Sequence, residues 1–395
     1  MKVLITTDAY APTISGVVTS VINLSTELAK MGHEVRILTL SHDGCSNKVN
    51  NVYYIKSFGI NVYPNVRATV SFNDKYLKEI IKWSPDIIHS QCEFFTFLFA
   101  KRISKKLNIP IVHTYHTMYE HYTDYVIKNQ AIGSKLVSVF SKGILNNVET
   151  VIAPTEKVRE SLKKYGVEKE IEVIPTGINL DKFKVKMTTE EKLQLKHDLG
   201  IGPEDRVILS VGRLGVEKNI DEILLNLPLL IEKHQSIKMV IVGDGPYRSH
   251  LEQKAMELQI GHHVIFIGMV APETISKYYQ LADIFVSASE SETQGLTYIE
   301  ALANGIPEIC KKDKCLEGVL ISGYNGFAYE KSQEFIEDMN YLLENYAVRS
   351  RMSVNAEKSA ERYGSYTFVR SVESLYQNAI MKNSYENVKG CYTYA

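Results

Sequence analysis

Glu292 and Glu300 are separated by seven residues, and the turn Gly295-Leu296-Thr297 lies between them. A strand is expected at 284–287 before this segment, and a helix at 298–304 after it. The N–H groups at the start of such a helix favour an anionic ligand such as a diphosphate. Glu300 could accept two ribose hydroxyls, and Glu292 would lie on the sugar side. These residue types indicate a nucleotide-sugar site, whereas the motif alone fits a solvated helix with a turn glycine equally well.

A second group of residues offers positive charge. Arg213 and Lys218 follow the strand expected at 207–211, and a helix starts close to Asn219. Two cations beside a helix N-terminus could balance the charge of a diphosphate leaving group. The run Gly243-Asp244-Gly245 also follows a strand, but plain turn chemistry explains it when it is taken alone.

Further candidates follow strands in the first half of the chain. Gly16 would let the backbone approach a ligand, and the helix that begins at Val17 would direct its positive dipole end toward that ligand. His113 and His116 end another strand, where alternation places them on different faces, so they are poor candidates for a joint metal site. We expect one histidine to be structural and His116, further into the loop, to be functional.

The elements that must position these residues alternate between strand and helix in both halves. Buried Val- and Ile-rich strands followed by helices are typical of parallel sheets covered on both faces, so we predict two doubly wound α/β domains. A breaker-rich stretch at 174–179 marks the boundary, and ligands of such folds bind at the carboxyl ends of the strands. The expected strands are 3–7, 34–40, 52–57, 86–90, 109–113, 151–154, 207–211, 239–242, 264–267, 284–287 and 306–310.

Composition limits the class of protein. The 395 residues are 45% hydrophobic and 23% charged, with a net charge of −1, which gives no reason to expect a nucleic-acid partner. We expect neither a leader nor a spanning helix, because the chain enters a strand directly and has no apolar run of roughly 18 to 20 residues. Five cysteines without metal-ligand spacing fit a cytoplasmic protein. Residues 1–175 hold 21 Lys and Arg against 16 Asp and Glu, which indicates different partners for the two halves or a chance imbalance.

Taken together, these motifs resemble the retaining glycosyltransferases of family GT4, and the resemblance covers nearly the whole chain. Within that family, 291–298 and 116–120 are most similar to bacterial diacylglycerol glucosyltransferases, the mono- and diglucosyl-diacylglycerol synthases. The resemblance implies the GT-B fold, with two Rossmann-like domains facing across a cleft. Residues 1–176 would bind the acceptor, 177–364 the nucleotide sugar, and 365–395 would pack back on the first domain. The matching segments are 15–17, 113–120, 174–177, 212–214, 217–219, 243–246 and 292–300.

The resemblance also implies an activity. A hexose, with glucose favoured, would pass from a UDP-sugar to diacylglycerol or glucosyl-diacylglycerol with retention of its α configuration, and no metal or other cofactor would be needed. Attack would come from the front face, with the leaving phosphate taking the acceptor proton, although the sequence leaves Glu292 open as a nucleophile. The implied catalytic residues are His116, Arg213, Lys218 and Glu292. The implied donor contacts are Gly16, Gly212, Arg213, Lys218, Gly245, Met269, Val270, Glu292, Gly295, Leu296, Thr297 and Glu300, and the implied acceptor contacts are Gly16, Val17, Tyr119 and Glu120.

An anionic membrane surface, on the inner face of the cell membrane, is a further expected partner. The apolar run 94–99 precedes a basic cluster at 101–106, which fits either a segment that lies on the bilayer or a core helix with a solvated basic end. Tyr119, Tyr122 and Tyr125 form a second candidate for contact with the lipid acceptor.

Two features depart from regular expectations. Glu308 stands in a strand where many relatives have an apolar residue, so it should lie near solvent or have a partner. Residues 366–381 are predicted as a long helix and 383–395 as a loose tail. Two alternative functions remain open: a GT4 transferase for a soluble, polymer or protein acceptor, and a non-catalytic partner subunit. The second is disfavoured, because a degenerate subunit would be free to lose the charged residues of the donor site.

Overall fold

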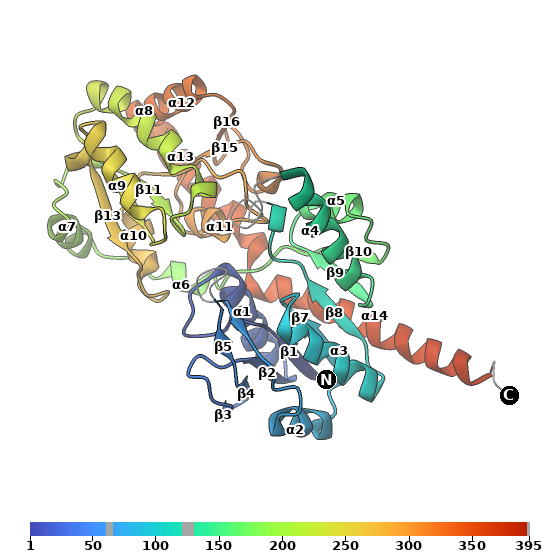
Figure 1. The fold of residues 1–395 in the computed structure, drawn as a ribbon. Helices are drawn as coiled ribbons and strands as arrows, with labels where there is room; N and C mark the ends of the chain where they lie inside the picture. The colour runs from blue at the N-terminus through green and yellow to red at the C-terminus, as the bar shows by residue number, and fades with distance from the viewer. Residues whose placement is uncertain (61–65, 121–129, 393–395) are drawn as a thin grey trace. The chain divides into compact units, whose positions relative to one another are not determined.

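The computed structural model describes residues 1–60, 66–120 and 130–392. The chain divides into two compact units, which are drawn as a ribbon in Figure 1. Unit 1 consists of Met1–Gly177 and Ser365–Ala395, and unit 2 consists of Ile178–Gly364. Each unit is built on its own parallel sheet with helices on both faces, which confirms the predicted fold class.

The sheet of unit 1 has the strand order β10-β9-β8-β7-β1-β2-β4-β3 among the described residues. The paired strands are parallel, except that β3 runs antiparallel to β4 at the edge. Successive residues of β1 serve opposite faces, since Val3 packs toward α1 and α14 while Leu4 packs toward α2 and α3. The strands are β1 (Lys2–Thr6), β2 (Glu34–Leu40), β3 (Asn47–Val49), β4 (Val52–Ile55), β7 (Ile87–Ser90), β8 (Ile111–Thr114), β9 (Thr150–Ala153) and β10 (Glu170–Val173), and β5 (Phe58–Gly59) pairs separately with β6 (Arg67–Ala68).

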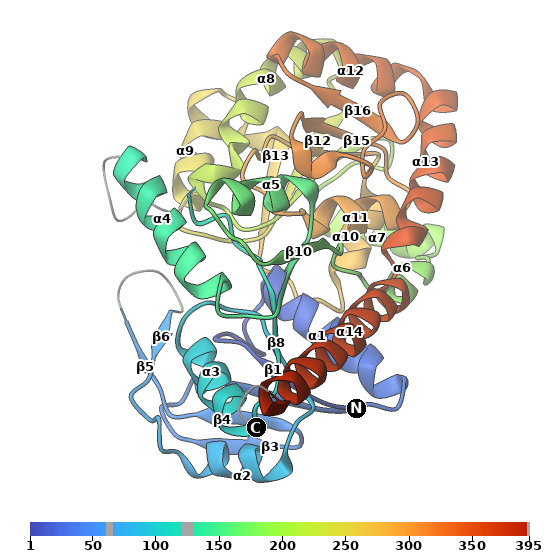
Figure 2. The same ribbon diagram turned by 90° about the vertical axis from the view of Figure 1, so that its right-hand side faces the viewer.

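The last helix of the chain belongs to unit 1. Figure 2 shows α14 running beside α1, and buried residues of both helices share one core cluster with the sheet. His89 of β7 accounts for part of this attachment, because its Nδ1 lies 2.6 Å from the hydroxyl of Tyr376. The helices of unit 1 are α1 (Gly16–Lys30), α2 (Lys75–Trp83), α3 (Phe95–Leu107), α4 (Gln130–Leu145), α5 (Glu156–Lys164) and α14 (Ser365–Tyr392).

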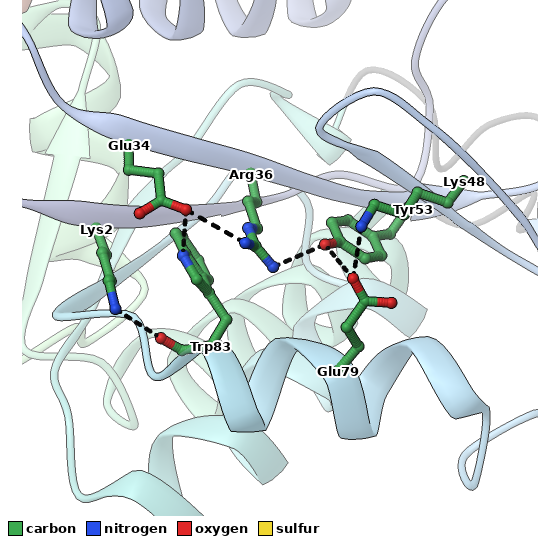
Figure 3. Close-up of polar contacts among 7 residues, drawn as sticks. All are labelled: Lys2, Glu34, Arg36, Lys48, Tyr53, Glu79 and Trp83. Carbon is green, nitrogen blue, oxygen red and sulfur yellow. Dashed lines mark hydrogen bonds and ion pairs between the residues drawn. The ribbon is translucent and has the colours of Figure 1, made fainter.

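A polar network fixes α2 on the sheet of unit 1 (Figure 3). The guanidinium of Arg36 donates to the hydroxyl of Tyr53 at 2.8 Å and lies 4.3 Å from the ring centroid of Trp83. The Tyr53 hydroxyl in turn donates to Glu79 at 2.9 Å, and the indole N–H of Trp83 donates to Glu34. Since these groups bond one another, the network is a structural connection between the sheet and α2.

The sheet of unit 2 has the order β13-β12-β11-β14-β15-β16 in the described part of the chain, with parallel pairing throughout. Buried aliphatic residues cover both of its faces. The strands are β11 (Arg206–Val211), β12 (Ile237–Val242), β13 (Val264–Gly268), β14 (Ile284–Ser287), β15 (Glu308–Lys311) and β16 (Gly326–Tyr329). The helices are α6 (Asp181–Lys184), α7 (Thr189–Asp198), α8 (Ile220–Lys233), α9 (Arg248–Glu257), α10 (Ile275–Leu281), α11 (Leu296–Ala303), α12 (Ser332–Glu344) and α13 (Tyr346–Ala360).

The structure corrects two expectations about the ends of elements. The loose tail expected from residue 383 is wrong as far as Tyr392, because α14 continues to that residue. Contacts with unit 1 hold the helix beyond 381, since Lys382 pairs with Glu149 at 2.7 Å and the Asn383 amide donates to the carbonyl of Asn108 at 2.9 Å. The strands β3, β5, β6, β10 and β16 are absent from the expected set. β3, β10 and β16 all lie at sheet edges, and β3 and β10 carry exposed polar residues, which removes the apolar run that marks a buried strand.

The expectation for Glu308 is also wrong. Its side chain has 0% exposure, and neither carboxyl oxygen has a hydrogen-bond partner among the described residues. Burial raises the pKa of this group well above its usual range, which favours the uncharged carboxylic acid inside unit 2.

Candidate active site

The candidate donor residues lie at the carboxyl edge of the unit 2 sheet. The loop after β11 and the loop after β12 pack backbone against backbone, and Leu214 N–H donates to the carbonyl of Asp244 at 2.9 Å. A Cβ atom at Gly243 would stand 1.9 Å from the carbonyl oxygen of Gly212, and one at Gly245 would stand 2.3 Å from that of Leu214. The glycines are therefore needed for close approach of the two loops, a requirement that turn chemistry alone did not predict.

Both cations of this edge already face carboxylates. The guanidinium of Arg213 pairs with Glu217, and Nζ of Lys218 pairs with Glu292. The Glu217 side chain is only 6% exposed, because its carboxylate folds back over Gly215. The structure thus brings Arg213, Lys218 and Glu292 into one charged cluster. The sequence analysis included Glu217 in a matching segment but did not predict its ion pair with Arg213, because Arg213 lies in a loop outside the short helix Val216–Lys218 that holds Glu217.

The helix that follows β14 begins earlier than expected. α11 starts at Leu296 instead of Tyr298, so Leu296 and Thr297 form its first turn. Gly295 precedes it with φ 72°, and a Cβ there would meet the Tyr298 ring at 2.3 Å. Only glycine fits this left-handed position, and as the N-cap residue it supplies no side-chain hydrogen bond to the helix. The backbone N–H groups at a helix N-terminus can bind a phosphate.

Glu300 lies half-buried on the same helix. The hydroxyl of Tyr279 donates to Glu300 Oε2 at 2.8 Å. Burial raises the pKa of Glu300 to about 7, while the Tyr279 hydrogen bond and the charge of Lys182 oppose that rise. Met269 and Val270 directly follow β13 at the same edge of the sheet, and Met269 is exposed.

The candidate residues of unit 1 follow adjacent strands of its sheet. Gly16 and Val17 open α1, and Ser15 caps that helix by accepting a hydrogen bond from Val18 N–H at 3.3 Å. His116 follows β8, and its Nε2 lies 2.7 Å from Oε1 of Gln91, which follows β7. Since β8, β7 and β1 are neighbours, these segments share the carboxyl edge of the sheet.

The environment of His116 fixes its charge. Burial lowers the pKa of His116 to about 3, and the nearby His113 adds to the effect. The imidazole is neutral near pH 7, so it can exchange hydrogen bonds with a hydroxyl but is not a source of positive charge. Gln91 orients the ring; it was missed because its link to His116 spans 25 residues.

His113 and Tyr119 contact a buried carboxylate, that of Glu93. His113 is fully buried, with Nε2 at 3.1 Å from Glu93, and it fills the structural role expected for one histidine. The Tyr119 hydroxyl also donates to Glu93. Glu120 lines a pocket of about 470 Å³ in unit 1 together with Lys135 and other residues. The predicted contacts of Tyr122 and Tyr125 lie outside the described residues.

A half-buried aspartate completes the carboxyl edge of unit 1. Asp8 follows β1 and accepts backbone hydrogen bonds from Phe95 N–H at 3.3 Å and Thr96 N–H at 2.8 Å. Phe94, the N-cap residue of α3, supplies no side-chain hydrogen bond, so Asp8 caps this helix from a distant part of the chain. Burial nevertheless raises the pKa of Asp8 to about 6. No local pattern signals this role, because the partners are 87 and 88 residues away.

Comparison with known proteins identifies the family. The model of Glycosyltransferase Family 4 matches residues 14–182, and that of Glycosyl transferases group 1 matches residues 191–359. An alpha-monoglucosyldiacylglycerol synthase of Streptococcus pneumoniae is 36% identical, over 98% of this chain and 88% of that protein. The chain belongs to the family 4 glycosyltransferases. The protein of the same name from Acholeplasma laidlawii is 32% identical, over 97% of this chain and 98% of its own length.

Solved structures agree with this family 4 assignment at the level of the fold. The HepE protein of Anabaena, in complex with UDP-glucose, has a TM-score of 0.76 and 16% identity, covering 96% of this chain and 100% of that one. Sucrose-phosphate synthase from Thermosynechococcus elongatus gives a TM-score of 0.75 at 19% identity, with 96% and 99% coverage. These similarities confirm the predicted GT-B fold.

The charged residues at the carboxyl edge of the unit 2 sheet, Arg213 and Lys218, suit this family 4 chain to stabilising a phosphate leaving group. Arg213, Lys218 and the N-terminus of α11 offer preorganised positive charge, which stabilises a leaving diphosphate more than it stabilises a neutral group. A departing nucleoside diphosphate is the natural ligand for such an arrangement, because sugar transfer leaves negative charge on the phosphate.

Proposed function

We propose that this glycosyltransferase moves a hexose, glucose in the first instance, from a UDP-sugar to diacylglycerol or glucosyl-diacylglycerol. The observation that carries the acceptor assignment is the nearly full-length alignment with two alpha-monoglucosyldiacylglycerol synthases, at 36% and 32% identity. The donor assignment is supported by the charged edge of unit 2, where Arg213, Lys218 and the start of α11 lie at the ends of neighbouring parallel strands.

The reaction needs no enzymic nucleophile. The bond from the anomeric carbon to the β-phosphate oxygen breaks, and its electron pair stays on the phosphate, where Arg213 and Lys218 neutralise it. The acceptor hydroxyl forms its bond to the anomeric carbon from the same face and gives its proton to the departing phosphate, so the α configuration is retained. Neutral His116 holds a sugar hydroxyl, and no metal or other cofactor takes part.

Each donor contact has a distinct task in this proposal. Backbone N–H groups of Leu296 and Thr297 bind the diphosphate at the N-terminus of α11. Glu300 accepts the ribose hydroxyls, and Glu292 accepts a hydroxyl of the transferred sugar. Since Glu292 pairs with Lys218 before the donor binds, the arriving diphosphate takes over that cation and releases the carboxylate for the sugar.

The proposed acceptor places the enzyme at the inner face of the cell membrane. No helix in the described ranges has both the length and the apolar character to cross a bilayer. Large apolar side chains are exposed on neighbouring parts of unit 1, where Phe94 stacks on Phe140 of α4 with ring centroids 5.5 Å apart. The surrounding lysines would attract anionic lipids. The exposed apolar residues are Phe94, Leu98, Leu136, Val139 and Phe140, and the exposed lysines of α3 and α4 include Lys101, Lys135 and Lys142.

The run 94–99 is only partly available for that contact. Phe97 and Phe99 are buried in the core of unit 1, whereas Phe94 and Leu98 are exposed. The segment therefore combines the two interpretations that its sequence left open. Its inner face belongs to the core, and its outer face, together with α4, is the proposed membrane surface.

Product analysis tests the proposal directly. The purified protein is incubated with a panel of UDP-sugars and anionic vesicles that contain diacylglycerol or monoglucosyl-diacylglycerol, and lipids are analysed by mass spectrometry. A hexose added to either lipid supports the proposal and identifies donor and acceptor together. Release of UDP from one donor without a lipid product would contradict the lipid acceptor and favour a soluble, polymer or protein acceptor.

A further inference from the structure

We propose that Lys311 and Glu222 form a clasp that positions the diphosphate-binding loop of unit 2. The inference rests on the proposed function, since it assigns these residues to the donor site. Neither residue is among the expected donor contacts. Lys311 lies at the carboxyl end of β15 and Glu222 in the first turn of α8, so the pair joins two elements that flank the charged edge.

The contact between them is bidentate. Nζ of Lys311 lies 2.9 Å from Oε1 and 3.0 Å from Oε2 of Glu222, across a sequence separation of 89 residues. The two side chains are 18% and 17% exposed. A half-buried, bidentate pair is screened less by water and salt than a surface pair, so it can hold its elements in place. Lys311 also lies 5.4 Å from the ring centroid of Tyr329.

Asn219 connects the pair of Lys311 and Glu222 to the loop that holds Lys218. Asn219 directly follows Lys218 and adopts the left-handed conformation, with φ 51°. Its side-chain amide donates to Oε2 of Glu222 at 2.7 Å. Because a non-glycine residue is strained in this conformation, the hydrogen bond to Glu222 helps to hold the turn. The turn sets where the backbone of Lys218 lies, and so where its ammonium can reach a phosphate.

The charge of Lys311 should favour diphosphate binding, as its positioning of the turn does. Lys311 neutralises a carboxylate that stands four residues from Lys218. Without the lysine, that carboxylate keeps its charge near the site of an incoming diphosphate and opposes binding. Loss of Lys311 should therefore weaken donor binding through both a looser turn and an added negative charge, while the chemical step after binding is affected less. Lys311 and Glu222 are positioning residues in this scheme, not catalytic ones.

Lys312 provides a matched control in the next position. It forms its own ion pair with Glu330, but the two side chains are 66% and 59% exposed. K311M and K312M each remove one lysine and one ion pair from neighbouring residues of the same chain. K311R keeps the cation and tests whether charge and reach suffice.

The experiment measures the Kd for UDP by calorimetry, KM for the UDP-sugar, kcat and Tm for the full chain and these variants. We expect K311M to raise Kd and KM by about tenfold, to change kcat by no more than about threefold, and to be largely rescued in K311R. K312M should match the wild type. K311Q, which also removes the cation, should raise Kd in the same way, and it tests the clasp if K311M does not fold.

Three results would overturn the inference. If the wild-type protein binds UDP and K311M binds it as tightly, the clasp has no role and the proposed function stands. If the wild-type protein binds no UDP or UDP-sugar, the proposed donor site and the clasp are both wrong. A fall in Tm without any change in Kd or KM would show a purely structural pair and also contradicts the inference.

Discussion

The hydroxyl of Tyr279 in α10 donates a hydrogen bond of 2.8 Å to Oε2 of Glu300 in α11. A hydrogen bond donated to a carboxylate stabilises its ionised form, so this contact lowers the pKa of Glu300. Burial outweighs it and leaves the pKa of Glu300 at about 7. A group proposed to accept ribose hydroxyls is therefore partly protonated at neutral pH.

Donor affinity should depend on pH through Glu300. Ribose hydroxyls donate to the ionised carboxylate, so binding favours loss of the proton, and affinity should rise as the pH rises through about 7 and then level off. Y279F removes a bond that lowers the pKa, and should shift this transition to higher pH. The measurement is the Kd for UDP between about pH 6 and about pH 8.5. E300Q should bind weakly and show no such transition; a wild-type curve that is flat across this range would contradict the role of Glu300.

Removing either principal donor contact should abolish most activity. Arg213→Ala takes away a cation that stabilises the leaving diphosphate, and Glu300→Ala takes away the ribose acceptor, so kcat/KM should fall by at least about 100-fold for each. Arg206→Ala is the control, because Arg206 lies at the opposite end of β11 and pairs with Asp283. Thermal unfolding should show that all three variants fold. Unchanged turnover in both test variants would refute the site assignment.

The proposed donor site could be recognised as a candidate because several of its signals are local in sequence. Gly295, Glu292 and Glu300 fall within nine residues, and each follows from what a helix N-terminus and a nucleotide require. Contacts between distant segments were not predictable in this way. Gln91 beside His116, and Asp8 at the start of α3, depend on which strands become neighbours in the sheet.

The fold was predicted in its central strands and less well at its edges. Fully buried strands such as β1 have an apolar run that identifies them, whereas β10 alternates exposed and half-buried residues at the edge of the sheet. The length of α14 depends on contacts made by Lys382 and Asn383 with other parts of unit 1, which no local pattern contains. Glu308 is the opposite case, since its sequence context marked it as anomalous but did not predict that it would be buried without a hydrogen-bond partner in the described structure.

Replacing Glu292 should strengthen binding of the product UDP but slow transfer of the sugar. E292Q removes the carboxylate that pairs with Lys218, so the diphosphate of UDP no longer competes with it, and the Kd for UDP should fall by a factor of about 3 to 10. Transfer should slow by about 100-fold, because the sugar loses its acceptor group. Calorimetry with UDP and initial-rate assays separate the two effects. Weaker binding of UDP to E292Q would argue against the exchange of partners.

Glu308 should limit the stability of unit 2. Its pKa is raised in the folded chain, so folding is favoured when the group is protonated, and this contribution declines as the pH rises above the unfolded value of 4.5. E308M replaces an unpaired buried acid with an apolar side chain of similar length and should raise the free energy of unfolding by about 1–3 kcal/mol near neutral pH. Chemical denaturation across pH is the measurement. The gain should grow with pH, and a variant less stable than the wild type at pH 8 would show that the carboxyl has a partner.

The exposed side chains of α4 should govern binding to anionic vesicles. Leu136 and Val139 lie one turn apart and are 53% and 65% exposed, so the double variant Leu136→Ser, Val139→Ser removes apolar area that would enter the interface, without disturbing the core. We expect the partition coefficient for anionic vesicles to fall by about tenfold or more, with turnover retained when the acceptor is presented in detergent micelles. Met256→Ser in α9 of unit 2, also exposed, is the control and should bind vesicles as the wild type does. Equal vesicle binding by all three proteins would place the membrane contact elsewhere on the chain.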